Sequence, residues 1–512
     1  MNVISDLLKY LFLFGICRSD EDASCACAHN GWQSDFENFL SLKTITNDND
    51  IQITKILTES SSEFDALCSI LDKSFFELIT KHTNERLDIF GNLKKRKIET
   101  ATLSEIYSVL GIVLIMCYNK MPSFHDYWSK TESLGNQKIK STMSRDRFTI
   151  LFSKLYFNNP SKPDNASKTF YLEKVLEIFG KSSRNARSEC HRQSIDEMMT
   201  KFKGRISFKQ FNPMKPIKRG IKLWARCDAM TGYVYDIDIY CGKNAKKATD
   251  QTLGESVVLH LIDSIPGDQR HKITLCFDRF FSSVNLFTKI PCSAVGTIQK
   301  NRKKLPKFTS NLKKFESEIL HKDGLTLSRW QDTKEVLVMS NCHSNAITTV
   351  KRTQKTGERK TATCPESIQF YNEYMGGVDL AGQMVSLYDF DRKSNKWWKR
   401  VFFKLFLIAV FNSYIIFKEL REKPNMAFID FMVPLAEQMI ERGKEGNEKH
   451  IGRPLKRKSL GKDHLIVVSD IRRQCIHCKS TKNKYLKTDT KCCACQQYIC
   501  KKCFYDYHMQ MS

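Results

Sequence analysis

The sequence has 512 residues, of which 41% are hydrophobic, so it can bury substantial cores and has room for roughly two to four domains. Its formal net charge of +26 indicates an anionic partner, most commonly nucleic acid, with an acidic membrane surface as the alternative. Seven of the 19 cysteines lie between residues 475 and 503 at metal-ligand spacings. This pattern excludes a small secreted disulfide protein and indicates a reducing compartment.

Two apolar stretches raise the question of a membrane. Residues 3–17 contain Asp6 and Lys9 and lack a basic start, which is not typical of a signal peptide. Residues 401–417 fall short of the roughly 20 residues that a spanning helix needs, and they contain polar side chains. We therefore expect a poorly ordered leader at residues 1–60 and a buried helix at residues 401–417.

Hydrophobic periodicity divides the rest of the chain. Apolar residues three and four apart predict helices over residues 61–188. Strand and helix patterns then alternate over 189–302, which is typical of an α/β sheet. Residues 303–365 predict an inserted β-rich segment, and helical patterns return from 366 to 442. The chain continues as a polar, basic linker at 443–470 and a cysteine-rich module at 471–512.

Three aspartates stand at positions that suit a metal site. Asp196 lies in a strand-like stretch, where neighbouring side chains point to opposite faces, so Glu197 cannot point into the same site unless the strand is distorted. Asp278 ends an apolar run, at the carboxyl end of a predicted strand where α/β sheets bind ligands. Asp379 follows a Gly-Gly pair that lets backbones approach closely.

Three carboxylates from separate elements suit Mg²⁺, and a pair of such ions can activate an attacking oxygen and stabilise the leaving oxygen of a phosphodiester. By spacing alone the pattern is weak, because the chain has 56 acidic residues and a lone aspartate more often caps a strand end.

Several long motifs strengthen the interpretation. The segments SIDEMMTKFKGRISFKQFNPMKPIKRGIKLWARCDAMTGYV, CFDRFFSS, VGTIQKNRKKLP, YNEYMGGVDLAGQM and RKSNKWWKRVFFKLF occur in this order. Together they resemble the piggyBac family of DNA transposases, and the resemblance covers roughly residues 60–512.

The resemblance implies a ribonuclease-H-like α/β core at 189–302 and 366–388, interrupted by the β-rich insertion and flanked by a helical dimerisation and DNA-binding region at 61–188 and 389–442. It also implies that Asp196, Asp278 and Asp379 are catalytic and bind two Mg²⁺ ions, with Glu197 a bystander. The expected activity is DNA cleavage through a hairpin and strand transfer at TTAA sites. The expected partners are transposon-end DNA and a second copy of the chain, in the nucleus.

One position departs from the family pattern. Family members commonly carry a further aspartate three residues after the third one, on the same helix face, and here that position is Gly382. Glycine cannot bind a metal, and inside a helix it costs about 1 kcal/mol relative to alanine. The alternative function is therefore a domesticated, non-catalytic protein that binds DNA or chromatin.

Basic and aromatic side chains near the acids are candidate DNA contacts, because cations bind phosphates and offset the charge of the acids. A solvated basic surface is the alternative for each isolated run. Adjacent helical residues point about 100° apart, so one of the two tryptophans can pack in the core while the other faces DNA. The candidates are Lys215, Lys218, Arg219, Lys300, Arg302, Lys303, Arg392, Lys393, Lys396, Trp397, Trp398, Arg453, Lys456, Arg457 and Lys458. The last four lie in GRPLKRK, which is also typical of a nuclear localisation signal or a charged linker.

The cysteine-rich module predicts two zinc ions in a compact cross-braced fold, because each ion takes four nitrogen or sulfur ligands. Seven ligands are candidates: Cys475, Cys478, Cys492, Cys495, Cys500, Cys503 and His508. His477, Cys493 or Asp506 could supply the eighth. In the piggyBac family such a module recognises transposon ends. By its own pattern it could equally be a RING-like or PHD-like finger, which makes a protein-interaction adaptor the second alternative function.

Overall fold

The structure is a computed structural model that describes residues 31–34, 36, 42–46, 51–131, 133–213, 215–242, 251–308, 311–353, 357–445, 464–482 and 484–511. The chain divides into two compact units, one within residues 1–446 and one within 447–512. Four of the candidate DNA contacts, Arg453, Lys456, Arg457 and Lys458, lie outside the described residues.

A mixed sheet forms the centre of the first unit. Its first part has the order β4-β3-β1-β5-β6, in which β1 is antiparallel to β3 and parallel to β5. The strands are β1 (Arg192–Lys201), β2 (Gln210–Phe211), β3 (Arg219–Asp228), β4 (Val234–Ile239), β5 (Thr274–Phe277) and β6 (Ser293–Thr297). The helices α8 (Leu253–Ile262) and α9 (Val284–Lys289) alternate with the later strands, as the sequence predicted.

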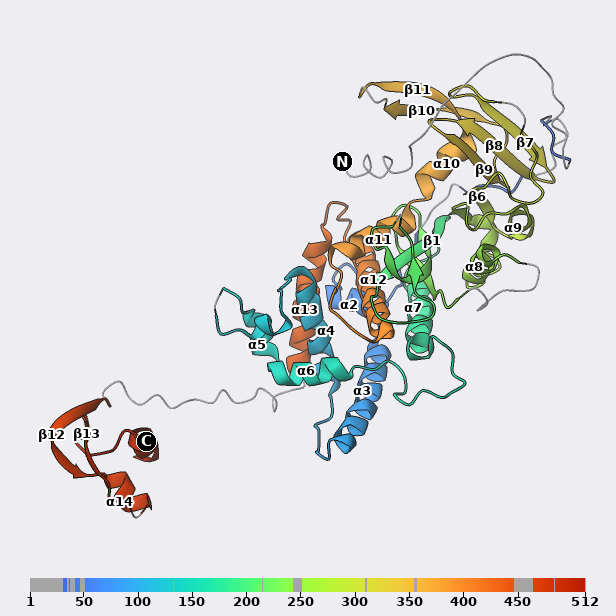
Figure 1. Cartoon of the computed structure of the whole chain (residues 1–512). Helices are drawn as coiled ribbons and strands as arrows, with labels where there is room; N and C mark the ends of the chain where they lie inside the picture. The colour runs from blue at the N-terminus through green and yellow to red at the C-terminus, as the bar shows by residue number, and fades with distance from the viewer. Residues whose placement is uncertain are drawn as a thin grey trace. The chain divides into compact units, whose positions relative to one another are not determined.

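The inserted segment extends the same sheet, because β9 pairs with the edge strand β6 and continues the sheet through β8 and β7 (Figure 1). Its strands are β7 (Ser317–Lys322), β8 (Leu325–Gln331), β9 (Glu335–Ser340), β10 (Ile347–Thr353) and β11 (Arg359–Pro365), and the last two form a separate hairpin. All five lie within the predicted β-rich segment.

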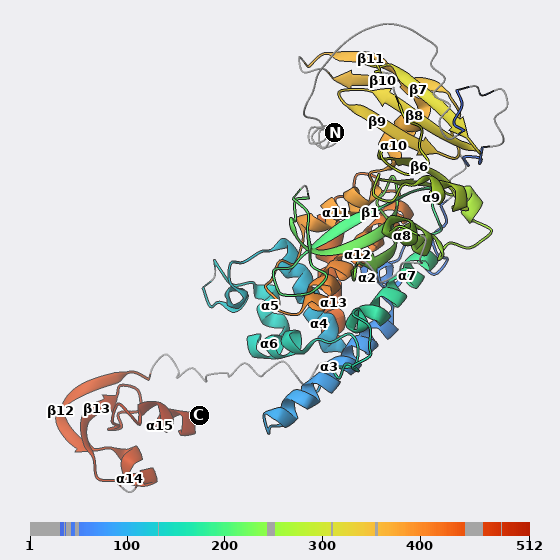
Figure 2. The same cartoon turned by 45° about the vertical axis from the view of Figure 1, so that its right-hand side comes forward.

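Helices that precede the sheet in the sequence and helices that follow it share one hydrophobic core. The earlier helices are α2 (Glu63–Cys68), α3 (Lys73–Leu93), α4 (Leu103–Tyr118), α5 (Gln137–Thr142), α6 (Arg145–Lys154) and α7 (Glu173–Ala186), and the later ones are α12 (Trp397–Leu420) and α13 (Phe428–Glu445). Helices α4 and α13 lie side by side although they are far apart in the sequence (Figures 1 and 2). Gly111 permits this contact, since a Cβ there would lie 3.0 Å from the carbonyl oxygen of Ala436. The helices before and after the sheet in the chain therefore form one helical region.

The helix α12 is long and apolar enough to cross a membrane by length and composition, but 94% of its most apolar window is buried inside the protein. Residues 401–417 are thus a buried helix, as predicted, and their polar residue Asn412 bonds to the backbone of Val234.

Parts of the predicted leader pack against the core, which differs from the expectation of poor order for residues 1–60. The side chain of Trp32 is 1% exposed and its Nε1 donates to the carbonyl oxygen of Lys304 at 2.9 Å. Lys43 donates to the carbonyl oxygen of Cys292 at 3.1 Å. A large indole gains most from burial, and this one has an acceptor for its N–H group.

The second unit contains a small sheet and two short helices: β12 (Ile466–Gln474), β13 (Lys487–Cys492), α14 (Ile476–Lys482) and α15 (Phe504–Met511). Its hydrophobic core contains five buried cysteines together with Ile499, Phe504 and Tyr507.

Candidate functional site

Strand register places the first two aspartates beside each other. Ile195 of β1 pairs with Phe277 of the parallel strand β5, so the next residues along the two strands are Asp196 and Asp278. Neighbouring strands lie about 4.8 Å apart, which puts both carboxylates at the carboxyl edge of β5. Glu197 points to the other face with Trp224, and Lys222 lies 3.9 Å from its Oε1 atom. The register of β1 is regular, so the two adjacent acids leave the strand on opposite faces, but the charge of Glu197 still raises the pKa of Asp196 and of Asp278.

A tight turn fixes Asp278. Its Oδ1 atom accepts the backbone N–H of Phe280 at 2.8 Å, and its carbonyl oxygen accepts that of Phe281 at 3.1 Å. Arg302 donates to the carbonyl oxygens of Arg279 and Phe280 in this turn. Arg302, a predicted DNA contact, therefore braces the turn that carries Asp278.

The third aspartate comes from α11 (Gly377–Leu387), which follows α10 (Glu366–Tyr374) and packs against β1 and β3. A Cβ at Gly377 would lie 2.3 Å from the carbonyl oxygen of Asp228 and 2.7 Å from Oγ of Ser194, so only glycine lets the helix begin this close to the strands. Asp379 lies in the first turn of α11, where the helix dipole favours a negative charge. Both cartoon views show α11 beside β1 (Figures 1 and 2).

Lys215 joins the acids. Its Nζ atom lies 3.6 Å from Oδ2 of Asp196 and 3.3 Å from Oδ1 of Asp379. The lysine comes from the connection between β2 and β3, so four separate segments of the chain meet here. Although Lys215 was predicted to contact DNA, in this structure it is the counterion of two carboxylates.

The acids share one electrostatic environment. Burial raises the pKa of Asp196 well above its usual range; Lys215 opposes this shift, and Glu197, Asp379 and Asp278 add to it. Burial also raises the pKa of Asp278, against the hydrogen bond from Phe280. Close carboxylates that are partly shielded from water repel one another, and a cation relieves this repulsion.

The donor set fits a hard divalent cation, because every ligand atom available from the three aspartates is a carboxylate oxygen. The three carboxylates are not among the groups whose ligand atoms all lie within 4.8 Å of one another. Two ligand atoms of one Mg²⁺ ion lie no more than about 4.2 Å apart, so in this arrangement the three carboxylates do not all meet at a single ion. Asp196, Asp278 and Asp379 are the residues that would hold Mg²⁺. Bound there, Mg²⁺ would polarise a phosphodiester and neutralise charge on its oxygens.

Gly382 lies in the same helix as Asp379, and nothing lies within 4 Å of the position that its Cβ would occupy. An aspartate at this position would meet no steric barrier. Packing therefore does not require glycine at this position.

The remaining basic candidates fall into two groups. Lys218, Arg219, Lys303 and Lys393 are exposed, and exposed Lys300 pairs with Glu335 at 2.6 Å. In contrast, Arg392 donates to the carbonyl oxygen of Met121, and Lys396 donates to the hydroxyl of Tyr156 at 2.9 Å. The exposed side chains can reach a phosphate, whereas Arg392 and Lys396 connect the segment before α12 to the segments that follow α4 and α6.

The tryptophan pair divides as the helix geometry predicts. Trp398 is 4% exposed and packs among Tyr156, Phe157 and Tyr171. Trp397 is half-buried and contacts the edge of Phe208 with ring centroids 5.2 Å apart. Core packing is thus shown for Trp398.

The cysteine module brings eight ligands into two groups. Cys475, Cys478, Cys500 and Cys503 form the first group, and His464, Cys492, Cys495 and His508 form the second. Ligand atoms within each group lie 3.3–3.8 Å apart where paired, for example 3.3 Å between Nε2 of His508 and Sγ of Cys495. A tetrahedral zinc ion separates its ligand atoms by about 3.5–4 Å, so both groups fit zinc.

The eighth ligand in this arrangement is His464 and none of the three candidates from the sequence. Cys493 accepts the backbone N–H of Leu465, His477 packs against Tyr507, and Asp506 is exposed. The Nδ1 atom of His508 donates to the carbonyl oxygen of Phe504, which directs Nε2 toward the group. The two groups alternate along the chain, which is the predicted cross-braced order.

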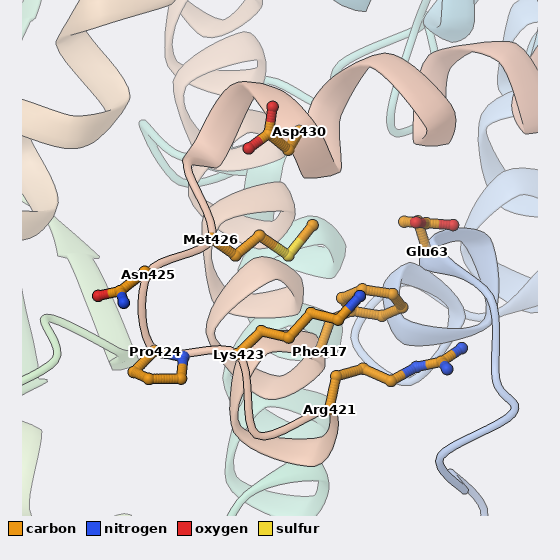
Figure 3. Close-up of a pocket in the computed structure, with 8 residues that line it drawn as sticks. All are labelled: Glu63, Phe417, Arg421, Lys423, Pro424, Asn425, Met426 and Asp430. Carbon is orange, nitrogen blue, oxygen red and sulfur yellow. The ribbon is translucent and has the colours of Figure 1, made fainter.

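A pocket of about 680 Å³ opens where α12 meets α13 and contains none of the predicted site residues. Arg421, Lys423, Asp430 and Glu63 bring charges of both signs to its wall (Figure 3). This pocket is therefore separate from the carboxylate site.

Sequence reasoning missed two features of these sites. His464 precedes the first cysteine pair in the sequence, and the only feature that could have identified it as a ligand was its position eleven residues before Cys475. The pairing of Lys215 with Asp379 depends on a contact between residues 164 positions apart, which one sequence does not reveal.

Comparisons with known proteins agree with this fold. The family model described as Transposase IS4 matches residues 63–414, more than half of the chain. Human PiggyBac transposable element-derived protein 3 is 27% identical over 458 residues, covering 86% of this chain and 75% of that protein. Human PiggyBac transposable element-derived protein 2 is 25% identical, covering 80% of this chain and 71% of the relative.

Among solved structures, a cryo-EM structure of the piggyBac transposase synaptic complex with hairpin DNA matches with a TM-score of 0.68 and 22% identity. The match covers 88% of this chain and 98% of that one. This match and the strand order confirm the predicted α/β core with its insertion and helical flanks. The chain belongs to the piggyBac-type transposase family.

Proposed function

We propose that the protein is a Mg²⁺-dependent DNA transposase that cleaves transposon ends and joins them to TTAA sites. The observation that supports this function is the meeting of Asp196 and Asp278 at one edge of the sheet, with Asp379 tied to Asp196 through Lys215. Hard oxygen ligands from three elements, beside exposed basic side chains, suit phosphodiester chemistry on DNA.

In the proposed reaction, the oxygen of water or of a DNA 3′-hydroxyl forms a new bond to phosphorus, and the former P–O bond breaks to leave a free hydroxyl. Lys218, Arg219, Lys303 and Lys393 would hold the DNA backbone, since they are exposed and cationic. The bound ion would stabilise the charge that develops on the phosphate oxygens. Asp196, Asp278 and Asp379 would position that ion.

The test uses DNA that carries the repeats flanking the protein's own gene. Purified wild type with Mg²⁺ should nick these ends and form hairpins, and Asp278→Asn should lose both products. Exposed Asp263 supplies the matched control, because Asp263→Asn removes the same charge outside the site. Equal cleavage by wild type and Asp278→Asn would contradict the assignment.

A non-catalytic DNA-binding protein is the second candidate, favoured by Gly382 and by relatives named as derived from transposable elements. It predicts tight binding of the same DNA in gel shifts with no cleavage by wild type. An interaction adaptor is a third candidate, favoured by the two zinc-type groups of the cysteine module. It predicts that residues 464–512, folded with zinc, bind protein partners and not DNA.

The proposed function carries two further expectations. A transposase acts on chromosomal DNA, so a tagged copy should accumulate in the nucleus. Two transposon ends are joined in one reaction, so the protein should be a homodimer in solution, which light scattering would measure as twice the mass of one chain.

A further inference from the structure

Lys215 is the one side chain in the described residues with ion pairs to both Asp196 and Asp379. Its side chain is 25% exposed, against 6% for Asp196 and 44% for Asp379, so the ammonium group lies between a buried carboxylate and an open one. No backbone contact within a helix or strand dictates this position, because Lys215 belongs to a connection between strands.

A divalent ion and this ammonium group require the same space. Mg²⁺ binds carboxylate oxygens at about 2.0–2.1 Å, so an ion shared by the two aspartates would lie between their oxygens. Nζ of Lys215 already lies between them at 3.3 and 3.6 Å. The positive charges of the ion and the ammonium group would also repel each other at this distance. Both cations cannot occupy the position together.

Charge indicates which cation the acids favour once Mg²⁺ is present. When both are ionised, Asp196 and Asp379 carry two negative charges, of which one ammonium balances one and a divalent ion balances both. The remaining acids, Asp278 and Glu197, add further negative charge, and Lys222 pairs with the second of them. The ion therefore has an electrostatic advantage, while the lysine keeps the acids together in its absence.

We propose that Lys215 and the divalent ion exchange at Asp196 and Asp379, and that the displaced ammonium group then contacts a DNA phosphate. This inference rests on the proposed function. The side chain has a flexible four-carbon stem and is already partly exposed. Two exposed cations follow it, Lys218 in the same connection and Arg219 at the start of β3. A lysine that swings outward thus meets the surface that the DNA backbone would approach. Lys215 is a positioning residue for the metal and a contact residue for the substrate.

The first experiment measures Lys215 directly in the wild-type chain. Lysines are labelled with an amine-reactive reagent in buffer without Mg²⁺ and in buffer with Mg²⁺, no chelator being added so that the cysteine module keeps its metal, and mass spectrometry reads the labelling of each site. We expect labelling of Lys215 to rise about tenfold with Mg²⁺, which corresponds to a weakening of its ion pairs by about 1.4 kcal/mol. Labelling of Lys203, an exposed lysine after β1, should not change.

The second experiment measures metal affinity by calorimetry with Mn²⁺ as the probe. Lys215→Met should bind Mn²⁺ about tenfold more tightly than wild type, because the competing cation is gone. Lys215→Arg keeps the charge and should remain near the wild-type affinity, and Lys203→Met serves as the matched control for the loss of one lysine.

The outcomes separate the two proposals. If Mn²⁺ binds to wild type but Lys215 labelling and the affinity of Lys215→Met stay unchanged, the exchange is wrong while the metal site stands. If neither wild type nor Lys215→Met binds Mn²⁺, the proposed catalytic function fails and the exchange fails with it. If labelling rises and the affinity tightens, the exchange is supported even where no DNA is cleaved.

Discussion

The two candidate metal sites of this protein are built in opposite ways. The aspartates stand on elements that a sheet and a helical core already hold, with Gly377 setting the distance between helix and strands. The eight ligands of the cysteine module lie within 45 residues, and five of them belong to the module's own hydrophobic core of eight buried residues. The first site is positioned by the fold, whereas in the second the metal must position the fold.

Because of this difference, the two regions should respond differently to loss of metal and to loss of core interactions. A site held by a large core loses its ion without unfolding, because hydrophobic burial keeps its elements in place. A short segment with three apolar core residues cannot offset its conformational entropy by burial alone. Removing metal should therefore unfold the cysteine module and leave the first unit folded. Removing core interactions of the first unit should destabilise that unit and leave the module folded.

The largest expected effect is zinc removal. A chelator should unfold residues 464–511 and leave residues 51–445 protected in hydrogen exchange, since structural zinc contributes about 10–16 kcal/mol of apparent binding free energy. Adjacent cysteines give a matched pair of variants. Cys492→Ala should reproduce the unfolding, and Cys493→Ala should not, because only Cys492 belongs to a ligand group. Protection of the module after complete zinc removal would contradict the comparison.

The first unit should instead depend on buried ion pairs. Arg187 is 2% exposed and pairs with Asp228 of β3 at 3.0 Å and with Glu419 of α12 at 2.8 Å, joining the sheet to the helical core. Arg187→Met should lower the free energy of unfolding by about 3–5 kcal/mol, because two carboxylates lose their partner. Denaturant unfolding measures this. Arg145→Met, at an exposed pair, should cost less than about 1 kcal/mol.

A buried lysine gives the first unit a pH response. Burial lowers the pKa of Lys404 to about 8, with Asp389 opposing the shift, against 10.5 for an ordinary lysine. As the pH rises, Lys404 loses its proton in the folded protein before it does so in the unfolded chain. Its contribution to the free energy of unfolding is therefore lowest below pH 8 and rises between pH 8 and 10.5.

Lys404→Met should stabilise the first unit by about 1–3 kcal/mol at pH 7, and the gain should shrink as the pH rises from 8 to 10.5. Thermal unfolding at several pH values measures this. Lys444→Met, at an exposed position on α13, serves as the control and should show no such trend. A gain that is constant with pH would show that packing and not charge explains the effect.

The smallest expected effect concerns Gly382. Because nothing lies within 4 Å of its Cβ position, Gly382→Asp should change the free energy of unfolding by less than about 1 kcal/mol. It should nevertheless tighten Mn²⁺ binding, since it adds a carboxylate to the helix that carries Asp379. Gly382→Ala separates the two effects, because it alters only helix propensity. Equal Mn²⁺ affinity in both variants would mean that this position does not face the ion.

Local patterns made the fold predictable to a large extent. The strand patterns before and after a Gly-containing turn identified β3 and β4, and a short apolar run that ends at Asp278 identified β5 and placed this aspartate at the edge of the sheet. Residues 366–442 were predicted as one helical stretch and form four helices, with breaks at 375–376, 388–396 and 421–427 that the apolar pattern did not reveal.

Long-range contacts explain what the sequence did not reveal. Trp32 looked like part of a loose leader, yet its partner, the carbonyl oxygen of Lys304, lies 272 positions away. Several basic residues looked alike along the chain, and only packing distinguishes exposed Lys393 from Lys396, which contacts Tyr156. Charge patterns identify a class of surface, whereas tertiary contacts decide which cations are available to a ligand.

The alternating order of the two zinc-type groups has a consequence for inheritance. His464 and His508, the outermost ligands, belong to the same group and enclose all four ligands of the other. A frameshift after residue 499 would remove Cys500 and Cys503 from the first group and His508 from the second. A splicing change that removed His464 would leave the second group with three ligands. The module cannot be shortened to a working half, so descendants of this gene are expected to keep it whole or to lose it whole.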